Sequence, residues 1–301
     1  MCMTEFVTSS AGDRVAYDKT GMGPALIFVA GAMQHRASDP LTTATAEAVA
    51  AQSVTAIVYD RLGRGESQVD DATHQSSDQS RAHSSDHSGD DSRDHSSDHS
   101  SDHSLDLPRE LAAITALLEV AGGSAVLCGH SSGCSIALAA AATGLPVNGL
   151  VLWEAPLAPQ GSGGREWAEE VERRVDAGDL EGALLHYMKD MPPEWLEGAR
   201  SAPFFPALVA QAPSLLADAQ SLAWAESAPH GELFASIRVP VEVMYGEQTL
   251  PIMEQAAESI VNAIPGAVQK RMPGANHSWE AEPMAQELAA FVHVSAVRPS
   301  A

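Results

Sequence analysis

Short apolar runs alternate with longer stretches of helical character along most of the chain. Runs such as ALIFVA and GLVLW hold consecutive apolar residues without polar alternation, which is typical of parallel strands covered on both faces. The stretches between them repeat apolar residues with the helical period. This alternation predicts an α/β fold, with a mostly parallel central sheet flanked by helices. Strands are expected at residues 14–18, 25–30, 55–59, 125–128, 149–153, 241–245 and 268–271, and helices at 41–51, 107–120, 132–142, 253–263 and 283–292.

The alternation is interrupted over residues 157–236, where helical segments follow one another without a convincing strand. One helix is expected to end before Gly178, and Asp179 is suited to cap the next helix. We therefore expect an inserted helical cap at 157–236, and a core formed by residues 1–156 and 237–301. Large apolar residues of this segment either line a pocket or hold its helices together: Trp167, Met188, Met191, Trp195, Phe204, Phe205 and Trp224.

Residues 70–105 differ from the rest because they consist largely of an irregular Asp-His-Ser-Ser repeat. The segment has almost no apolar side chains to bury, so we expect a disordered insertion between a strand and a helix. Histidines recur there every four residues, at 95, 99 and 103, and on a helix this spacing would favour Zn²⁺, Ni²⁺ or Cu²⁺. The serine-rich composition opposes a stable helix, and any metal bound there is expected to be incidental to catalysis.

Charge and composition exclude several classes of function. The chain carries 40 acidic side chains and 17 Lys or Arg, a formal net charge of -23, so we expect no binding to nucleic acid or anionic membranes. No secretion signal is recognised and no apolar run reaches the roughly 18 residues of a membrane span, which predicts a soluble, cytoplasmic protein. Cys2, Cys128 and Cys134 match no metal or disulfide spacing. The oligomeric state is left open.

The stretch AVLCGHSSGCSIAL, residues 125–138, contains a motif with chemical meaning. Residues 129–133 fit G-x-S-x-G between an expected strand and an expected helix, which is the context of a nucleophile elbow. Gly129 and Gly133 leave room for a sharp reversal of the chain, and the bend presents the hydroxyl of Ser131 above the sheet edge. The alternative is a glycine-rich turn without chemistry. His130 is expected to face away from that hydroxyl and to be structural.

A serine hydroxyl needs a general base at neutral pH, and the order serine, acid, histidine places that base late in the chain. His277, in KRMPGANHSW, follows the last expected strand and is the preferred base; the alternative is an ordinary loop histidine. The acid has two candidates. VEVMYGEQTLP has Thr249 where an acidic residue is expected and Glu247 close by, whereas Glu154 ends a strand beside the elbow strand. We predict that Glu154 orients His277, with Glu247 in reserve; Glu154 as a salt-bridging residue at the cap entrance is the alternative.

Attack on a carbonyl group also requires backbone N–H donors that stabilise the developing oxyanion. In ALIFVAGAMQHR the strand is followed by Gly31, which leaves room for the backbone to approach a ligand. The helix after the elbow supplies a second donor at its first residue. We therefore predict that the amides of Ala32 and Ser132 form the oxyanion hole, with Met33 as the next choice for the first of them.

Taken together, these motifs resemble the α/β-hydrolase family over nearly the whole chain outside the repeat. The resemblance is carried by VAGA, YDRLGRGES, GHSSG, the cap and PGANHSW. YDRLGRGES is similar to the family's D-x-x-G-x-G-x-S loop, in which Asp60 is expected to be structural. The usual acid position is not acidic here, and a glutamate at position 154 resembles the arrangement in haloalkane dehalogenases. Those enzymes use an aspartate nucleophile, so Ser131 excludes their chemistry and implies acyl transfer to water.

From these residues we expect a serine hydrolase that cleaves a small or medium, largely uncharged ester, thioester or amide-like substrate, without a cofactor or catalytic metal. Ser131 attacks the carbonyl carbon, His277 transfers the proton and Glu154 orients His277. Three alternatives stay open. The chain is a lyase or cofactor-free oxidative enzyme of the same fold, a ligand-binding protein whose triad has degraded at Thr249, or a metal-buffering protein that acts through the repeat.

Overall fold

The computed structural model describes residues 4–70 and 105–296, so nearly all of the repeat, whose disorder was predicted, lies outside the described residues. The described part contains a nine-stranded sheet in the order β1-β2-β4-β3-β5-β6-β7-β8-β9. Neighbouring strands from β4 through β8 are parallel, whereas β1, β2 and β9 join the edges in antiparallel orientation. This is the mostly parallel sheet, flanked by helices, that the apolar pattern predicted.

All seven predicted strands are present, and two short edge strands were not predicted. The strands are β1 (Glu5–Thr8), β2 (Arg14–Thr20), β3 (Ala25–Val29), β4 (Thr55–Tyr59), β5 (Ala125–His130), β6 (Val147–Trp153), β7 (Val241–Gln248), β8 (Val268–Ala275) and β9 (Ser278–Trp279). The two missed strands, β1 and β9, have four and two residues. A strand this short is too brief for a period of two residues to stand out from loop sequence.

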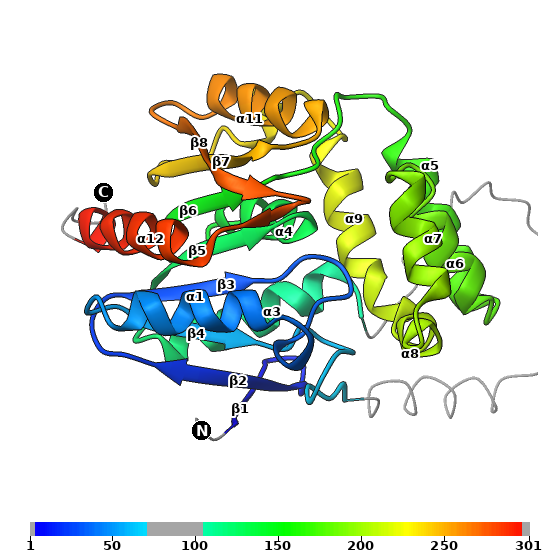
Figure 1. The fold of residues 1–301 in the computed structure, drawn as a ribbon, viewed down its shortest axis with the longest axis horizontal. Coiled ribbons are helices and arrows are strands. Elements are labelled where there is room, and N and C mark those ends of the chain that lie inside the picture. The colour runs from blue at the N-terminus through cyan, green and yellow to red at the C-terminus, as the bar shows by residue number, and fades with distance from the viewer. Residues whose placement is uncertain (1–3, 71–104, 297–301) are drawn as a thin grey trace, which may run out of the picture.

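Helices cover both faces of the sheet, as Figure 1 shows. The core helices are α1 (Pro40–Ala50), α3 (Leu107–Val120), α4 (Ser132–Ala142), α11 (Pro251–Ala263) and α12 (Ala281–Ala296). Helices α1 and α12 share one apolar cluster with the sheet, and α3, α4 and α11 share another on the opposite face. Helix α4 is mostly apolar and is buried along nearly its whole length, which fits a helix between a sheet and further helices.

The segment predicted as a cap contains only helices among its regular elements. Between β6 and β7 these are α5 (Gly164–Asp176), α6 (Leu180–Tyr187), α7 (Pro193–Ser201), α8 (Phe205–Ala210), the 3₁₀ helix η2 (Ala212–Leu215), α9 (Leu216–Ala225) and α10 (His230–Leu233). As expected, the side chain of Asp179 caps α6 by accepting from Gly182 N–H at 3.1 Å. Helix α9 packs against α3 and α4 of the core and against α5 (Figure 1). The division of the chain into core and cap stays a prediction.

The parallel topology determines where the candidate site forms. Carboxyl ends of parallel strands meet at one edge of a sheet, and ligands of open α/β sheets bind outside that edge. Ala32 follows β3, Ser131 follows β5, Glu154 follows β6 and His277 follows β8, so all four lie beyond the same edge. Within the described ranges, every helix is too short or too polar to cross a bilayer.

Candidate active site

Ser131 occupies a strained bend between a strand and a helix. Strand β5 ends at His130 and α4 begins at Ser132, so Ser131 is the only residue between them. Its backbone has φ 54° and ψ −128°, a conformation that L-residues rarely adopt and that persists only where the surroundings enforce it. The bend is held by its own amide, which donates to the carbonyl of Trp153 on β6 at 2.9 Å.

The two glycines of the motif are required by close backbone contacts. A Cβ atom on Gly129 would lie 2.6 Å from Cα of Cys134, and one on Gly133 would lie 2.1 Å from the carbonyl oxygen of Val29. Both distances are far below van der Waals contact, and both partners are backbone atoms that cannot rotate away. The elbow therefore needs glycine at both positions, as the motif predicted.

We expect Gly133→Ala to lower the free energy of unfolding by about 2 to 4 kcal/mol, because the new methyl group displaces β3 or α4. Urea denaturation followed by circular dichroism measures the change. Gly198→Ala is the matched control, since Gly198 lies on α7 with nothing within 4 Å of an added Cβ. There alanine is expected to be neutral or to stabilise by about 0.5 to 1 kcal/mol. Equal effects of the two substitutions would contradict this reading of the elbow.

Positive φ angles recur at the other two predicted members of the site. Among the non-glycine residues that the structure describes, six have positive φ, and these include Ser131, Glu154 at 47° and His277 at 65°. Strained backbone of this kind clusters at functional sites, where packing holds it against its own preference. The concentration of strain beyond one sheet edge thus supports a functional site there, independently of the side-chain chemistry.

The structure brings Glu154 and His277 together. Oε2 of Glu154 lies 2.5 Å from Nδ1 of His277, and its Oε1 accepts from Gly246 N–H at 3.0 Å. Burial, with the carboxylate residue only 2% exposed, opposes ionisation of Glu154. The hydrogen bonds that it accepts outweigh that effect, so its pKa lies below the ordinary value and the group is ionised at neutral pH. A carboxylate only accepts, so Nδ1 of His277 carries the proton and Nε2 is left with its lone pair.

Glu247, the reserve acid, is placed differently. Its side chain is exposed, and the bond to the His277 ring comes from Glu154 instead. The pairing between β7 and β8 shifts its register between Gly246 and Gln248, so Glu247 falls on an irregular position of the strand. The side chain of Thr249, at the position where the family pattern expects an acid, is one of the groups whose hydrogen bonds lower the pKa of Glu154.

His130 has a link to the base that the sequence did not reveal. Its Nε2 donates to the carbonyl of His277 at 2.9 Å, and its Nδ1 lies 2.9 Å from Oε1 of Gln34. Burial, with the neighbouring His277 ring as a second cause, lowers the pKa of His130 to about 4. His130 was expected to be structural, but its partner lies 147 residues further along the chain, and no local pattern indicates such a contact.

Backbone donors are available where the oxyanion hole was predicted. The amide of Gly31 donates to Oε1 of Gln34 at 2.9 Å, whereas the amides of Ala32 and Ser132 have no acceptor within the described part of the chain. Met33 follows with a positive φ of 63°, which turns the chain sharply after Ala32. Two N–H groups beside the elbow are thus left for a bound group, and the assignment of Ala32 and Ser132 as oxyanion donors stays a prediction.

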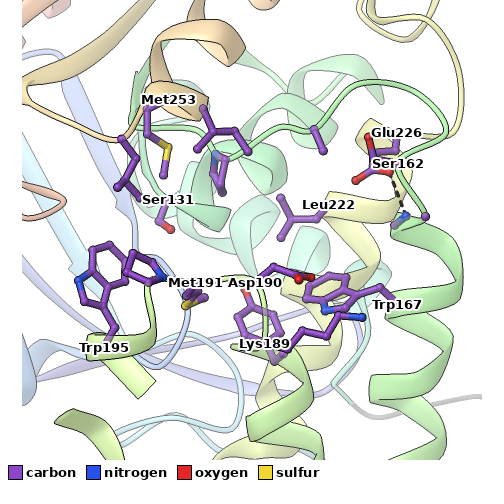
Figure 2. Close-up of a pocket in the computed structure, with 18 of the residues that line it drawn as sticks. Ser131, Ser162, Trp167, Lys189, Asp190, Met191, Trp195, Leu222, Glu226 and Met253 are labelled. Carbon is purple, nitrogen blue, oxygen red and sulfur yellow. Dashed lines mark hydrogen bonds between the residues drawn. The ribbon is translucent and has the colours of Figure 1, made fainter. Parts of the chain in front are cut away.

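A cavity of about 350 Å³ opens onto Ser131 and His277. Figure 2 shows the Ser131 side chain at its edge, with Met253, Leu222, Trp195 and Trp167 around it. Three of the large apolar residues predicted from the cap segment line it: Trp167, Met191 and Trp195. The other four do not: Met188 is buried among the cap helices, Phe205 packs against them, Trp224 faces a second cavity and Phe204 is 60% exposed. The walls are therefore largely apolar next to the serine.

Charged groups line the cavity as well. Lys189, Asp190 and Glu226 contribute to its wall, and Glu226 accepts from Gly164 N–H at 2.9 Å. The ring of Trp195 stands against the ring of His277, with centroids 5.7 Å apart and planes inclined by 37°. An aromatic residue of the cap segment thus contacts the predicted base directly.

Comparisons with known proteins agree with this fold. A model described as alpha/beta hydrolase family matches residues 26–291. The crystal structure of an alpha/beta hydrolase from Sphaerobacter thermophilus is 26% identical, covers 95% of this chain and 99% of its own, and has a TM-score of 0.70. A thermophilic esterase from Thermogutta terrifontis is 21% identical, with coverage of 97% and 96% and a TM-score of 0.54. An esterase from Exiguobacterium antarcticum is 16% identical, with coverage of 97% and 100% and a TM-score of 0.59. No curated protein matches the chain significantly in sequence.

Proposed function

Since this chain belongs to the alpha/beta hydrolase family, we propose that it is a carboxylesterase-like serine hydrolase. Its substrate is a small or medium, largely uncharged ester, thioester or amide-like compound, and the reaction passes through an acyl-enzyme on Ser131. One observation carries the proposal. A strained serine and a histidine held by a buried carboxylate line the same cavity.

In the proposed reaction, each of these groups has one role. The hydroxyl of Ser131 attacks the carbonyl carbon while Nε2 of His277 takes its proton, and Glu154 stabilises the imidazolium that forms. The amides of Ala32 and Ser132 donate to the oxyanion of the tetrahedral intermediate. His277 then returns the proton to the leaving group, and water, activated in the same way, releases the acid from Ser131.

The cavity supports the size and polarity of the proposed substrate. Pockets for small molecules commonly measure about 300 to 1,000 Å³, and a volume of about 350 Å³ falls at the lower end of that range. Leu222, Met253 and Trp195 supply apolar surface near Ser131, which favours an acyl group without charge because burying a charge there would be costly.

The test uses the purified wild-type chain with p-nitrophenyl acetate, butyrate and octanoate, together with a fluorophosphonate probe whose attachment site is mapped by mass spectrometry. We expect turnover of the short esters and a phosphonyl adduct on Ser131. An adduct without turnover of any ester would favour a non-hydrolytic enzyme of the same fold. Neither adduct nor turnover would favour a ligand-binding protein with an inactive triad.

A further inference from the structure

Four charged side chains are buried together where the cap segment meets the core. Arg61 and Arg64 follow β4, Glu110 lies on α3 and Asp218 lies on α9, and each is at most 2% exposed. Buried charges are strongly destabilising unless they are paired. Two guanidinium groups and two carboxylates balance in formal charge, and Nε of Arg61 lies 3.2 Å from Oε1 of Glu110. The proposed reaction as described above uses none of these four groups.

Asp218 joins the cluster to the elbow. Its Oδ1 accepts from Nη1 of Arg61 at 2.6 Å and from Oγ of Ser132 at 2.6 Å, and its Oδ2 lies 2.5 Å from Nη2 of Arg64. Burial opposes ionisation of Asp218, but the charges of Arg61 and Arg64 outweigh burial and hold its pKa below the ordinary value. A carboxylate from the cap segment therefore fixes the residue whose amide is one proposed oxyanion donor.

Arg64 reaches the peptide that carries the other donor. Its Nη1 donates to the carbonyl oxygen of Gly31 at 2.7 Å, and its Nε donates to Oγ of Ser214 at 2.9 Å. The carbonyl of Gly31 and the N–H of Ala32 belong to one peptide group, which is planar and trans, so the two bonds point in opposite directions. A guanidinium held against the oxygen thus determines where the Ala32 N–H points, and it also polarises the peptide, which makes that N–H a stronger donor.

We propose that Arg64, held in place by Asp218 of helix α9, is a positioning residue that directs the Ala32 amide at the oxyanion of the reacting substrate. The inference rests on the proposed hydrolase function and extends it, because the cap segment then takes part in transition-state stabilisation as well as in enclosing the cavity. Arg64 itself is fully buried and does not touch the substrate cavity as lined in the structure.

The proposal predicts a selective loss of transition-state binding in Arg64→Met. We expect kcat/KM for p-nitrophenyl butyrate to fall about 10- to 100-fold, mainly through kcat, because one oxyanion donor is misdirected and not removed. The inhibition constant of 1,1,1-trifluorohexan-2-one, whose adduct with Ser131 carries an oxyanion, should rise by the same factor. That of hexan-2-one, which binds without an adduct, should change by less than about twofold.

Two further variants separate positioning from general stability. Asp13→Asn removes a buried carboxylate that pairs with Arg109. Asp13 is distant from the elbow in the sequence and makes none of the contacts described for it, so this substitution should leave both inhibition constants unchanged. Arg64→Lys keeps the charge, but an ammonium cannot serve Gly31, Ser214 and Asp218 together, so it should show the same selective loss as Arg64→Met. If Arg64→Met does not fold, Arg64→Lys is measured in its place.

The outcomes distinguish this proposal from the function on which it rests. A wild type that neither hydrolyses the ester nor binds the trifluoromethyl ketone would overturn both. A wild type that does both, with folded Arg64 variants of unchanged inhibition constants, would overturn only the positioning role. An equal rise for the two ketones, or the same rise in Asp13→Asn, would also overturn it, because a structural defect would then explain the loss.

Discussion

Ser131→Ala and His277→Ala are each expected to lower kcat/KM for a p-nitrophenyl ester by at least about 1,000-fold, while the fold is retained. Without the hydroxyl no acyl-enzyme forms, and without the imidazole the hydroxyl stays protonated and unreactive at neutral pH. The double variant should be no slower than either single variant, because the two groups act as one unit. Stopped-flow or steady-state assays of p-nitrophenol release measure kcat/KM for all three variants.

His293→Ala is the matched control for the histidine. His293 lies exposed on α12, where its Nε2 is 2.9 Å from the carbonyl oxygen of Gln52, away from the carboxyl ends of the strands. Its removal should leave kcat/KM within about twofold of the wild type. Ester turnover that persists in Ser131→Ala would show that Ser131 is not the nucleophile. A fluorophosphonate adduct on another residue would do the same.

The parts of the site that were predicted from the sequence are those encoded within a few residues. The elbow combines an apolar strand, two glycines around a serine and an apolar helix, and the contacts of Gly129 and Gly133 show that each glycine is demanded locally. The mostly parallel sheet is likewise encoded strand by strand, because continuous apolar runs mark strands that are covered on both faces. These patterns can be recognised in the sequence without the tertiary structure.

The parts that could not be predicted depend on contacts between distant segments. The Arg64 side chain donates to the backbone carbonyl of Gly31, and the His130 side chain donates to that of His277. Every residue has a backbone carbonyl, so the residue type does not indicate which one accepts. Which residues of the cap segment line the cavity also depends on contacts between distant segments. Trp195 faces His277 while Phe204 faces solvent, although both are large aromatic residues of neighbouring helical segments.

The acid lies between these cases. Strands β6 and β7 are neighbours in the sheet, so Glu154 after one and Glu247 near the end of the other both approach the region beyond the sheet edge. Strand assignment alone cannot separate them, since paired strands lie only about 4.8 Å apart. Local backbone separates them instead: Glu154 adopts a positive φ and meets His277, whereas Glu247 lies at the irregular register of β7 and is exposed.

Glu154→Gln is therefore expected to lower kcat by about 1,000- to 10,000-fold with little change in KM. The amide keeps the size of the carboxylate, but it no longer stabilises the imidazolium. If its NH₂ faces the ring, Nδ1 of His277 must also accept, and the proton then moves to Nε2, the nitrogen that should take the proton of Ser131. Steady-state kinetics with p-nitrophenyl butyrate, and thermal unfolding of the same samples, test this expectation.

Glu247→Gln makes the same chemical change on the neighbouring strand and should leave kcat within about twofold of the wild type, because that side chain is exposed and His277 bonds to Glu154. A large loss in Glu247→Gln together with a small loss in Glu154→Gln would transfer the orienting role to Glu247. Large losses in both, with lowered unfolding temperatures in both, would indicate that the edge of β7 supports the site structurally. The sharp contrast between two substitutions on adjacent strands is expected because a carboxylate affects the imidazolium strongly only at hydrogen-bond distance, where burial keeps water from screening its charge.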